Sequence, residues 1–156
     1  MTIPTIEELE FRPKVISDAC IYFELRWRAK DRRIGVIKAA IFDDDTADLG
    51  DLIIDDLQAQ HAEKLSLLKR AGLFRNWRKY LSLKLRGPAE LRQQPAGTFL
   101  LNNTLADLRA RGCRRAIGRV AAADVDEHPS LIGWYQKLGF TARERMGGYE
   151  ISRQLD

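Results

Sequence analysis

Apolar and polar residues alternate along the segment that begins at Cys20. One side of this alternation is apolar, with Ile21, Phe23, Leu25 and Trp27. The other side is mostly polar, with Tyr22, Glu24, Arg26 and Arg28. A period of two residues is typical of a β-strand that is buried on one face only. The pattern therefore predicts a strand whose apolar face packs on the core.

Two further strands are predicted before the middle of the chain. Residues 29–33 are polar and indicate a turn, and 34–42 indicate the returning strand. Three aspartates at 43–45 indicate a solvated turn, and 52–59 form a third strand candidate. Three strands in a row favour an antiparallel meander. Residues 1–14 show no clear period, and their two prolines argue against one long helix.

The last third of the chain alternates between helical and strand patterns. The strongest helix is predicted from Gly97 to Arg111, with Gly112 as its stop signal. Its apolar stripe consists of Leu100, Leu101, Leu105 and Leu108. A short strand follows over 114–121.

A second helix and a hairpin complete the predicted order. Pro129 suits a first helical position and Gly139 ends the helix. The segments 140–145 and 149–155 then flank Gly147-Gly148, which suits a two-residue hairpin turn. No G-x-G-x-x-G follows a strand, so a Rossmann-type nucleotide fold is disfavoured.

A basic segment separates the two halves. Apolar residues recur at helical spacing between 61 and 91, and Gly87-Pro88 ends the pattern. From His61 to Arg92 there are nine basic and two acidic residues, so this window carries a net charge of +7. The whole chain carries +4, so the residues outside the window carry −3. The segment is predicted to be an amphipathic basic helix, or two short ones.

Size and composition place further bounds on the protein. A chain of 156 residues with 45% hydrophobic content is expected to form one domain over 1–156. No apolar run approaches the roughly 20 residues that span a bilayer, and no leader pattern appears, so a cytoplasmic protein is expected. Two cysteines and two histidines without ligand spacing predict no metal site.

The start of the strong helix offers a phosphate site. A helix N-terminus has unpaired N–H groups and a partial positive charge, so it binds phosphate without special side chains. The residues concerned are Arg92, Gln93, Gln94, Pro95, Ala96, Gly97 and Thr98. Pro95 has no N–H, but its fixed φ suits a helix start. An ordinary helix start is the alternative interpretation.

Two motifs in this order resemble the GNAT family of N-acetyltransferases. The segment from Arg92 to Gly97 is similar to the family's pyrophosphate loop, with proline in place of its first glycine, and Tyr135-Gln136-Lys137-Leu138-Gly139-Phe140 is similar to its best-preserved helix end. The resemblance implies a mixed, mostly antiparallel sheet flanked by helices, which is an α/β (α+β) fold. It also implies acetyl-coenzyme A as cosubstrate and a primary amine, on a small molecule or a protein, as acceptor.

The resemblance assigns roles to particular residues. Tyr135 would protonate the departing coenzyme thiolate, because a phenol of pKa about 10 can donate to a thiolate. Lys137 belongs to the same motif, and His128 stands where many members have an asparagine that binds the coenzyme arm. The coenzyme's amides would pair with a splayed strand edge at Leu57, Gln58 and Ala59. A carboxylate base is expected among Glu24, Asp55 and Asp56.

Two departures from the family pattern leave alternatives open. Fewer than twenty residues precede the first hairpin, where the family has a strand and two helices, and the basic insert 61–91 has no usual counterpart. We expect the insert to form a wall of the acceptor site. Its basic side chains either suit an acidic or phosphorylated partner or only solvate the outer face of a packed helix. Nucleic-acid or membrane binding is disfavoured. A non-catalytic protein of this fold that binds a partner through its basic surface is the alternative function. A homodimer and the identity of the acceptor stay open.

Overall fold

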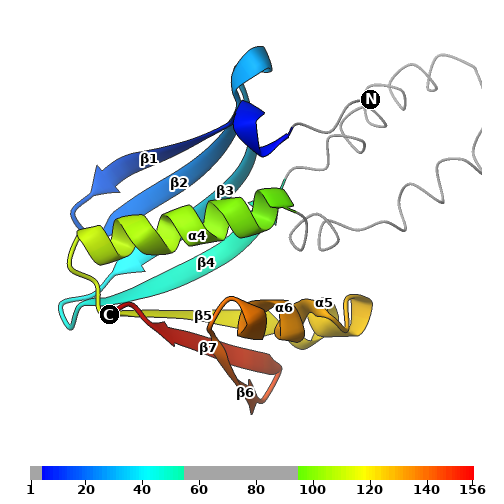
Figure 1. Cartoon of the computed structure of the whole chain (residues 1–156). Coiled ribbons are helices and arrows are strands. Elements are labelled where there is room, and N and C mark those ends of the chain that lie inside the picture. The colour runs from blue at the N-terminus through cyan, green and yellow to red at the C-terminus, as the bar shows by residue number, and fades with distance from the viewer. Residues whose placement is uncertain (1–4, 55–94) are drawn as a thin grey trace, which may run out of the picture.

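The computed structural model describes residues 5–54 and 95–156. They form a seven-stranded sheet in the order β1-β2-β3-β4-β5-β7-β6 (Figure 1). The strands are β1 Leu9–Ser17, β2 Cys20–Trp27, β3 Arg32–Ile41, β4 Thr46–Ile54, β5 Arg115–Ala121, β6 Thr141–Arg145 and β7 Gly148–Gln154. Only β4 and β5 pair in parallel. The expected mixed, mostly antiparallel sheet is confirmed, and an all-parallel sheet is excluded.

Strand β1 corrects the interpretation of residues 1–14. It pairs antiparallel with β2 through a turn at Asp18 and Ala19, so no helix separates these strands. Most of its side chains after Phe11 are exposed, so no two-residue period marks it. An edge strand also tolerates Pro13, which cannot donate a hydrogen bond. The short helix η1 Ile6–Glu8 precedes it and is closed by the Glu8 carboxylate accepting from Thr5 N at 2.9 Å.

Strand β4 begins earlier than the sequence pattern indicated. The prediction placed this strand at 52–59, whereas it starts at Thr46 and is described as far as Ile54. Its pairing with β3 shifts register between Ile37 and Ala39, which interrupts the alternation of apolar positions. Residues 55–59, and the predicted basic insert 61–91, lie outside the described residues.

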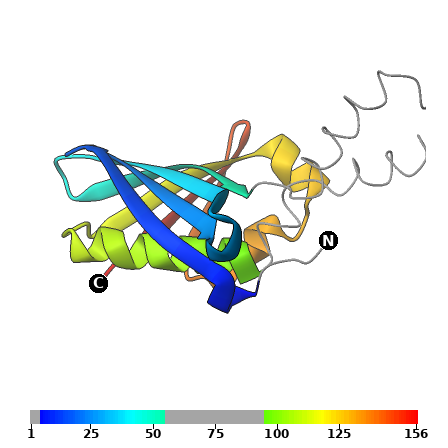
Figure 2. The same cartoon turned by 90° about the horizontal axis from the view of Figure 1, so that it is seen from above.

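The pleat divides the sheet into two different faces. Helix α4 Pro95–Ala110 packs across β1–β4, and α6 Leu131–Lys137 lies beside it against β5–β7 (Figures 1 and 2). We call this side, which carries Phe23, Leu49 and Gly118, the covered face. We call the opposite side, which carries Tyr22, Glu24 and Arg26, the open face. The predicted alternation in β2 is confirmed residue by residue.

Helix α4 supplies much of the core on the covered face. All four leucines of its predicted stripe are buried. The helix ends in a Schellman arrangement, because Gly112 N donates to Arg109 O at 2.9 Å and Cys113 N donates to Leu108 O at 3.0 Å. Gly112 has a φ of +92°, which favours glycine. The predicted stop signal is therefore confirmed.

The segment after β5 forms two helices where one was predicted. Helix α5 Ala122–Glu127 was missed, and α6 begins at Leu131, not at Pro129. Leu131 N donates to His128 O at 2.9 Å, which places Pro129 second in a turn, a position that proline's fixed φ also suits. Gly139 ends α6 with a φ of +83°, as expected.

The final hairpin is confirmed, but its two turn residues are Met146 and Gly147 and not the predicted Gly147-Gly148, since Gly148 already belongs to β7. Strands β6 and β7 pair antiparallel around Met146-Gly147, and Gly147 has a φ of +87°. A Cβ on Gly148 would lie 2.1 Å from Val120 O, so this position requires glycine. Among the described helices, none is long and apolar enough to cross a membrane.

Candidate active site between β4 and β5

The two parallel strands at the centre of the sheet diverge. They pair only where Thr46–Leu49 of β4 meets Arg115–Gly118 of β5. Beyond that point β4 stays paired with β3 as far as Ile54, and β5 stays paired with β7 as far as Ala121. The facing edges of 50–54 and 119–121 therefore form no ladder with each other within the described sheet. Such an edge presents N–H and C=O groups to which an extended ligand can add.

Helix α4 begins at the same end of the sheet where β4 and β5 diverge (Figure 1). Its first residue is Pro95, followed by half-buried Ala96 and buried Gly97. The N–H groups of the first turn have no partner within a helix, and the helix dipole adds a partial positive charge there. Arg92, Gln93 and Gln94, predicted to belong to this site, lie outside the described residues.

Tyr135 lies in a buried aromatic group on α6. Its side chain is 7% exposed, and that of Trp134 is 8% exposed. The two rings meet edge to face with centroids 4.7 Å apart, and Tyr135 meets Phe140 in the same way at 5.6 Å. Edge-to-face aromatic pairs are favourable and directional. The tyrosine of the predicted motif is thus held from two sides.

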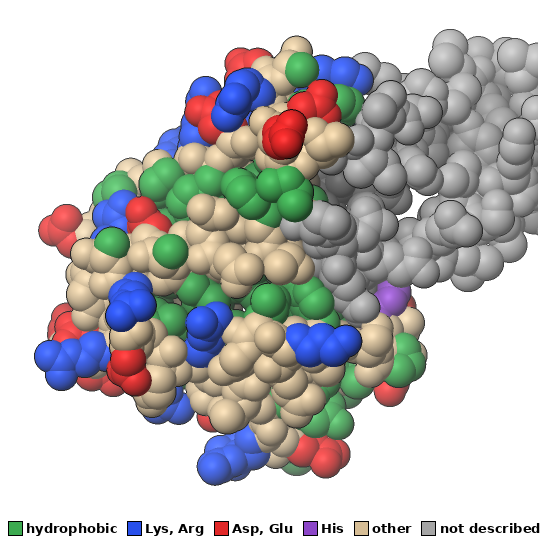
Figure 3. Space-filling view, in the orientation of Figure 1, with side chains coloured by type: hydrophobic (Ala, Val, Ile, Leu, Met, Phe, Trp, Pro, Cys, Tyr) green, Lys and Arg blue, Asp and Glu red, His purple; other side chains and the backbone are tan. Residues whose placement is uncertain are grey.

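A hydrogen bond joins the two helices beside the predicted motifs. Trp134 Nε1 donates to Thr98 Oγ1 at 3.1 Å, from α6 to the first turns of α4. The space-filling view shows the surface hollowed below α4, with hydrophobic side chains inside the hollow (Figure 3). The sequence did not reveal this contact, because the two residues are 36 positions apart.

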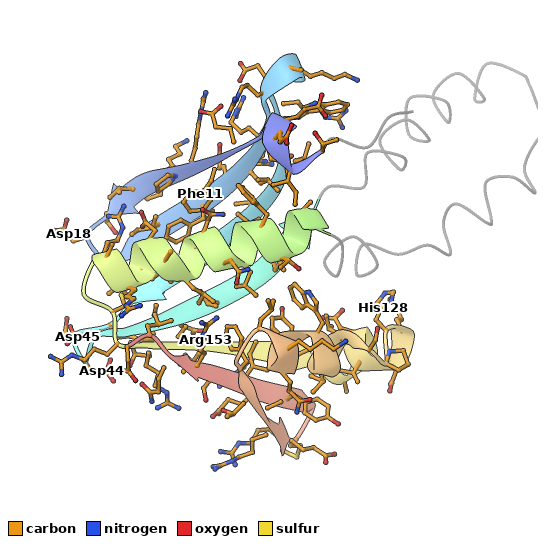
Figure 4. All side chains as sticks on the ribbon, in the orientation of Figure 1. Phe11, Asp18, Asp44, Asp45, His128 and Arg153 are labelled. Atoms are coloured by element: carbon orange, nitrogen blue, oxygen red, sulfur yellow. The ribbon has the colours of Figure 1, made fainter. Side chains whose placement is uncertain are left out.

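The end of α6 is fixed by Arg153, a residue that sequence reasoning missed. Arg153 Nη1 donates to Leu138 O at 2.6 Å, from β7 to the last turn of α6 (Figure 4). A Cβ on Gly139 would lie 3.3 Å from Arg153 Nε. A cation at a helix C-terminus also complements the negative end of its dipole. Lys137, in the same turn, is exposed.

His128 lies at the bend between α5 and α6 (Figure 4). Its N–H donates to Asp124 O at 3.0 Å, and its Nε2 lies 3.8 Å from Glu127 Oε2. The side chain is largely buried, with 14% exposed. This position closes α5, and a role toward the coenzyme arm stays a prediction.

Glu24 lies on the open face, opposite the face that carries Tyr135. Its carboxylate is 3.5 Å from Arg26 Nη1, and Arg26 also donates to Asp31 Oδ1 at 3.0 Å. Glu24 is thus a half-buried carboxylate beside a guanidinium that two acids share. The other predicted bases, Asp55 and Asp56, and the predicted edge residues Leu57, Gln58 and Ala59 lie outside the described residues.

A depression of about 660 Å³ lies at the C-terminal end of β5. Its lining combines two arginines, Arg119 and Arg145, with two acids, Asp124 and Glu150. Arg145 Nε lies 3.7 Å from Glu150 Oε2. Sequence reasoning missed this feature, although the glycine turn at 147–148 that lines it was recognised. Among the described residues, no group of three or more metal-binding side chains occurs.

Solved structures with a similar fold are acetyltransferases. An acetyltransferase of the GNAT family from Staphylococcus aureus has a TM-score of 0.54 and 13% identity, over 88% of this chain and 69% of that one. The ribosomal-protein-S18-alanine N-acetyltransferase of Escherichia coli has a TM-score of 0.56 and 14% identity, over 90% and 72%. PaiA N-acetyltransferase of Thermoplasma acidophilum, in complex with coenzyme A, has a TM-score of 0.55 and 13% identity, over 87% and 61%.

Sequence comparison adds no closer relative. No protein-family model matches the chain, and no curated protein sequence matches it. At identities of 13–15% the structural likeness establishes the architecture and not the activity. The TM-scores of 0.54–0.56, over 87–90% of this chain, place the described sheet and helices in the same arrangement as these neighbours. The chain therefore has the fold of the GNAT N-acetyltransferases.

Proposed function

We propose that this protein transfers an acetyl group from acetyl-coenzyme A to a primary amine. The observation that carries the proposal is the convergence of three features at one end of the sheet. These features are the diverging edges of β4 and β5, the N-terminus of α4 and Tyr135, with Trp134 bonded to Thr98 between the helices. The structural neighbours are acetyltransferases, and one is in complex with coenzyme A.

The N-terminus of α4 would hold the coenzyme's pyrophosphate. The N–H groups of Ala96 and Gly97 have no partner within the helix and would donate to the phosphate, and Arg92 would add positive charge. The pantetheine amides would pair with the free edge of β4, which is described over 50–54 and is predicted to extend to Leu57–Ala59. The acetyl thioester would then lie between β4 and β5.

The reaction requires one proton acceptor and one donor. A base takes a proton from the ammonium form of the acceptor, and the free amine then attacks the thioester carbonyl. The tetrahedral intermediate collapses with cleavage of the C–S bond, and Tyr135 donates its proton to the sulfur. The nitrogen of the intermediate, which still carries two hydrogens, loses one of them in this step, and that proton returns Tyr135 to its phenol form. The products are the N-acetyl amine and coenzyme A.

The open face offers the route for the amine. Tyr135 lies on the covered face and Glu24 on the open face, and the sheet is unpaired between β4 and β5. Tyr135 would act on a thioester in that opening from the covered face. Glu24 lies on β2, two strands away from β4, so it would act from the open face through water. Glu24 is the candidate for the base among the residues that the structure describes, and Asp55 and Asp56 remain alternatives. The depression at the end of β5, with its paired charges, borders the same opening and is the proposed acceptor region.

Calorimetry with acetyl-coenzyme A tests the cofactor assignment. We expect binding by the unaltered chain and none by Gly97→Glu, because a carboxylate at the helix start blocks and repels phosphate. Asn102→Glu is the matched control, since it adds the same charge at an exposed position farther along α4. Equal binding by Gly97→Glu and the control would contradict the assignment. Binding without acetylation of any amine would favour the non-catalytic alternative.

Tyr135→Phe tests the acid, because it keeps both aromatic contacts and removes only the hydroxyl. General acid catalysis typically contributes ~10²–10⁴-fold, so turnover should fall by that order with coenzyme affinity little changed. Glu24→Gln tests the base, with Glu10→Gln, on the open face of the neighbouring strand, as control. Equal rates for both glutamate variants would leave Asp55 or Asp56 as the base.

A further inference from the structure

The hydrogen bond between Trp134 and Thr98 has a defined direction. An indole Nε1–H donates only, whereas a hydroxyl both donates and accepts. Trp134 is therefore the donor, and Thr98 Oγ1 is the acceptor, at 3.1 Å. The hydroxyl hydrogen of Thr98 is not used in this bond. It is left to donate elsewhere.

The place of Thr98 decides where that donor matters. Thr98 is the fourth residue of α4, next to Gly97, and its side chain is half-buried. An anion at the start of α4 would receive the first-turn N–H groups and could also accept from this hydroxyl. A hydroxyl that donates to an anion becomes a better acceptor, since hydrogen bonds in a chain polarise one another. Anion binding would thus strengthen the bond from Trp134.

Trp134 connects the Thr98 hydrogen bond to Tyr135, the proposed acid. Tyr135 follows it in the chain, and the two rings are in edge-to-face contact at 4.7 Å. Phe140 supports the other side of the tyrosine ring. A movement of the indole would therefore move one of the two ring contacts that hold Tyr135. The hydrogen bond to Thr98 is what fixes the indole from α4.

We propose that Trp134 is a positioning residue, which couples occupation of the α4 N-terminus to the orientation of Tyr135. Coenzyme bound through its pyrophosphate would draw Thr98 and Trp134 together and so set the phenol for proton donation. Without the coenzyme the phenol would be less well oriented. This inference rests on the proposed function and adds to it a residue outside the motif's fixed positions.

Steady-state kinetics of two isosteric variants test the coupling. Trp134→Phe keeps a ring beside Tyr135 and removes the N–H, and Thr98→Val removes the acceptor. Each should lower kcat by about tenfold, the range of one lost hydrogen bond. Thr98→Val should also weaken coenzyme binding, whereas Trp134→Phe should change the KM for acetyl-coenzyme A little. Thr98→Ser should restore both parameters.

The double variant separates coupling from two independent defects. If the bond acts as a unit, the double variant should lose no more kcat than the worse single variant. Multiplied losses in kcat would overturn the inference. A Thr98→Ser variant with kcat as low as that of Thr98→Val would indicate a merely structural contact at this position and would also overturn the inference.

Fluorescence provides a readout that does not depend on turnover. In a variant with Trp27→Phe and Trp77→Phe, Trp134 is the sole tryptophan of the chain. Coenzyme A should shift its emission, and adding Thr98→Val should abolish the shift while calorimetry still detects binding at higher concentration. Binding with no change of emission would overturn the inference and leave the proposed function intact. Failure of the unaltered chain to bind coenzyme A would contradict both the inference and the proposed function.

Discussion

The two faces of the sheet use the same strands for different purposes. On the covered face, Phe23 is 0% exposed and stacks on Phe11 at 5.7 Å between ring centroids. On the open face, its neighbours Tyr22 and Glu24 are half-buried among charged side chains. Along one strand, the residues of the covered face thus contribute to stability, and the residues between them, on the open face, are available for chemistry. The comparison shows that the pleat keeps the two requirements from competing for the same positions.

The faces also differ in charge. Among the strand side chains that the structure describes, nine basic and four acidic ones lie on the open face by register, a balance of +5, although residues 5–54 and 95–156 together carry −1. The basic ones are Arg12, Lys14, Arg26, Arg33, Lys38, Arg115, Arg119, Arg143 and Arg145, and the acidic ones are Glu10, Glu24, Asp48 and Glu150. The basic segment 61–91 is therefore not the chain's one concentration of positive charge.

The largest expected difference between the faces is in stability. Phe23→Ala should lower the free energy of unfolding by about 3–5 kcal/mol, because it leaves a cavity in the core. Tyr22→Ala, one residue away on the open face, should cost about 1 kcal/mol or less. Urea denaturation of both variants measures the contrast. Similar losses at the two positions would mean that the open face is packed as tightly as the covered one.

The second-largest expected difference is in the stability cost of replacing an arginine on each face. Arg153→Met removes the hydrogen bond to Leu138 O at the end of α6 and should cost about 2 kcal/mol, as for other hydrogen bonds from charged groups. Arg143→Met on the open face of β6 should change stability by less than about 0.5 kcal/mol. Thermal melts of the pair check this. A cost at Arg143 as large as that at Arg153 would contradict the assignment of faces.

Replacing a threonine should have a smaller effect on stability, with opposite signs at Thr104 and Thr141. Thr104 is fully buried in α4, and its Oγ1 has no hydrogen-bond partner within 5–54 and 95–156, so Thr104→Val should stabilise the protein by about 1 kcal/mol. Thr141 Oγ1 lies 3.1 Å from Ser152 O and is exposed, so Thr141→Val should destabilise slightly. Denaturant midpoints report both signs. A loss of stability in Thr104→Val would show that the buried hydroxyl is used.

The cysteines should differ in reactivity without any change of stability. Cys20 is half-buried on the open face, whereas Cys113 is buried. Burial raises the pKa of the Cys113 thiol, and the nearby Asp45 carboxylate raises it further. Only the thiolate reacts, so labelling of Cys113 should be slower and should accelerate as the pH rises toward that raised pKa. Mass spectrometry during alkylation at several pH values follows each site, and faster labelling of Cys113 would contradict this.

Agreement between sequence and structure depends on how local each signal is. The alternation in β2 and the leucine stripe of α4 each predict which side chains of one element are buried, and both predictions are confirmed. Strand β1 was missed because an edge strand with exposed side chains has no period to read. The helix predicted over Pro129–Gly139 is present as α6, but its predicted start was wrong, because proline suits both a helix start and the second position of a turn.

The sequence by itself determined the order of strands and helices in the second half except for α5, the two-faced character of β2 and the motif that contains Tyr135. These features depend on residues within a few positions of one another, where spacing alone fixes which side chains share a face. Only the tertiary structure decided that β4 and β5 diverge, that Trp134 reaches Thr98 and that Arg153 holds the end of α6. Such contacts join segments far apart in the chain, so their partners are chosen by how the helices pack on the sheet and not by any local pattern.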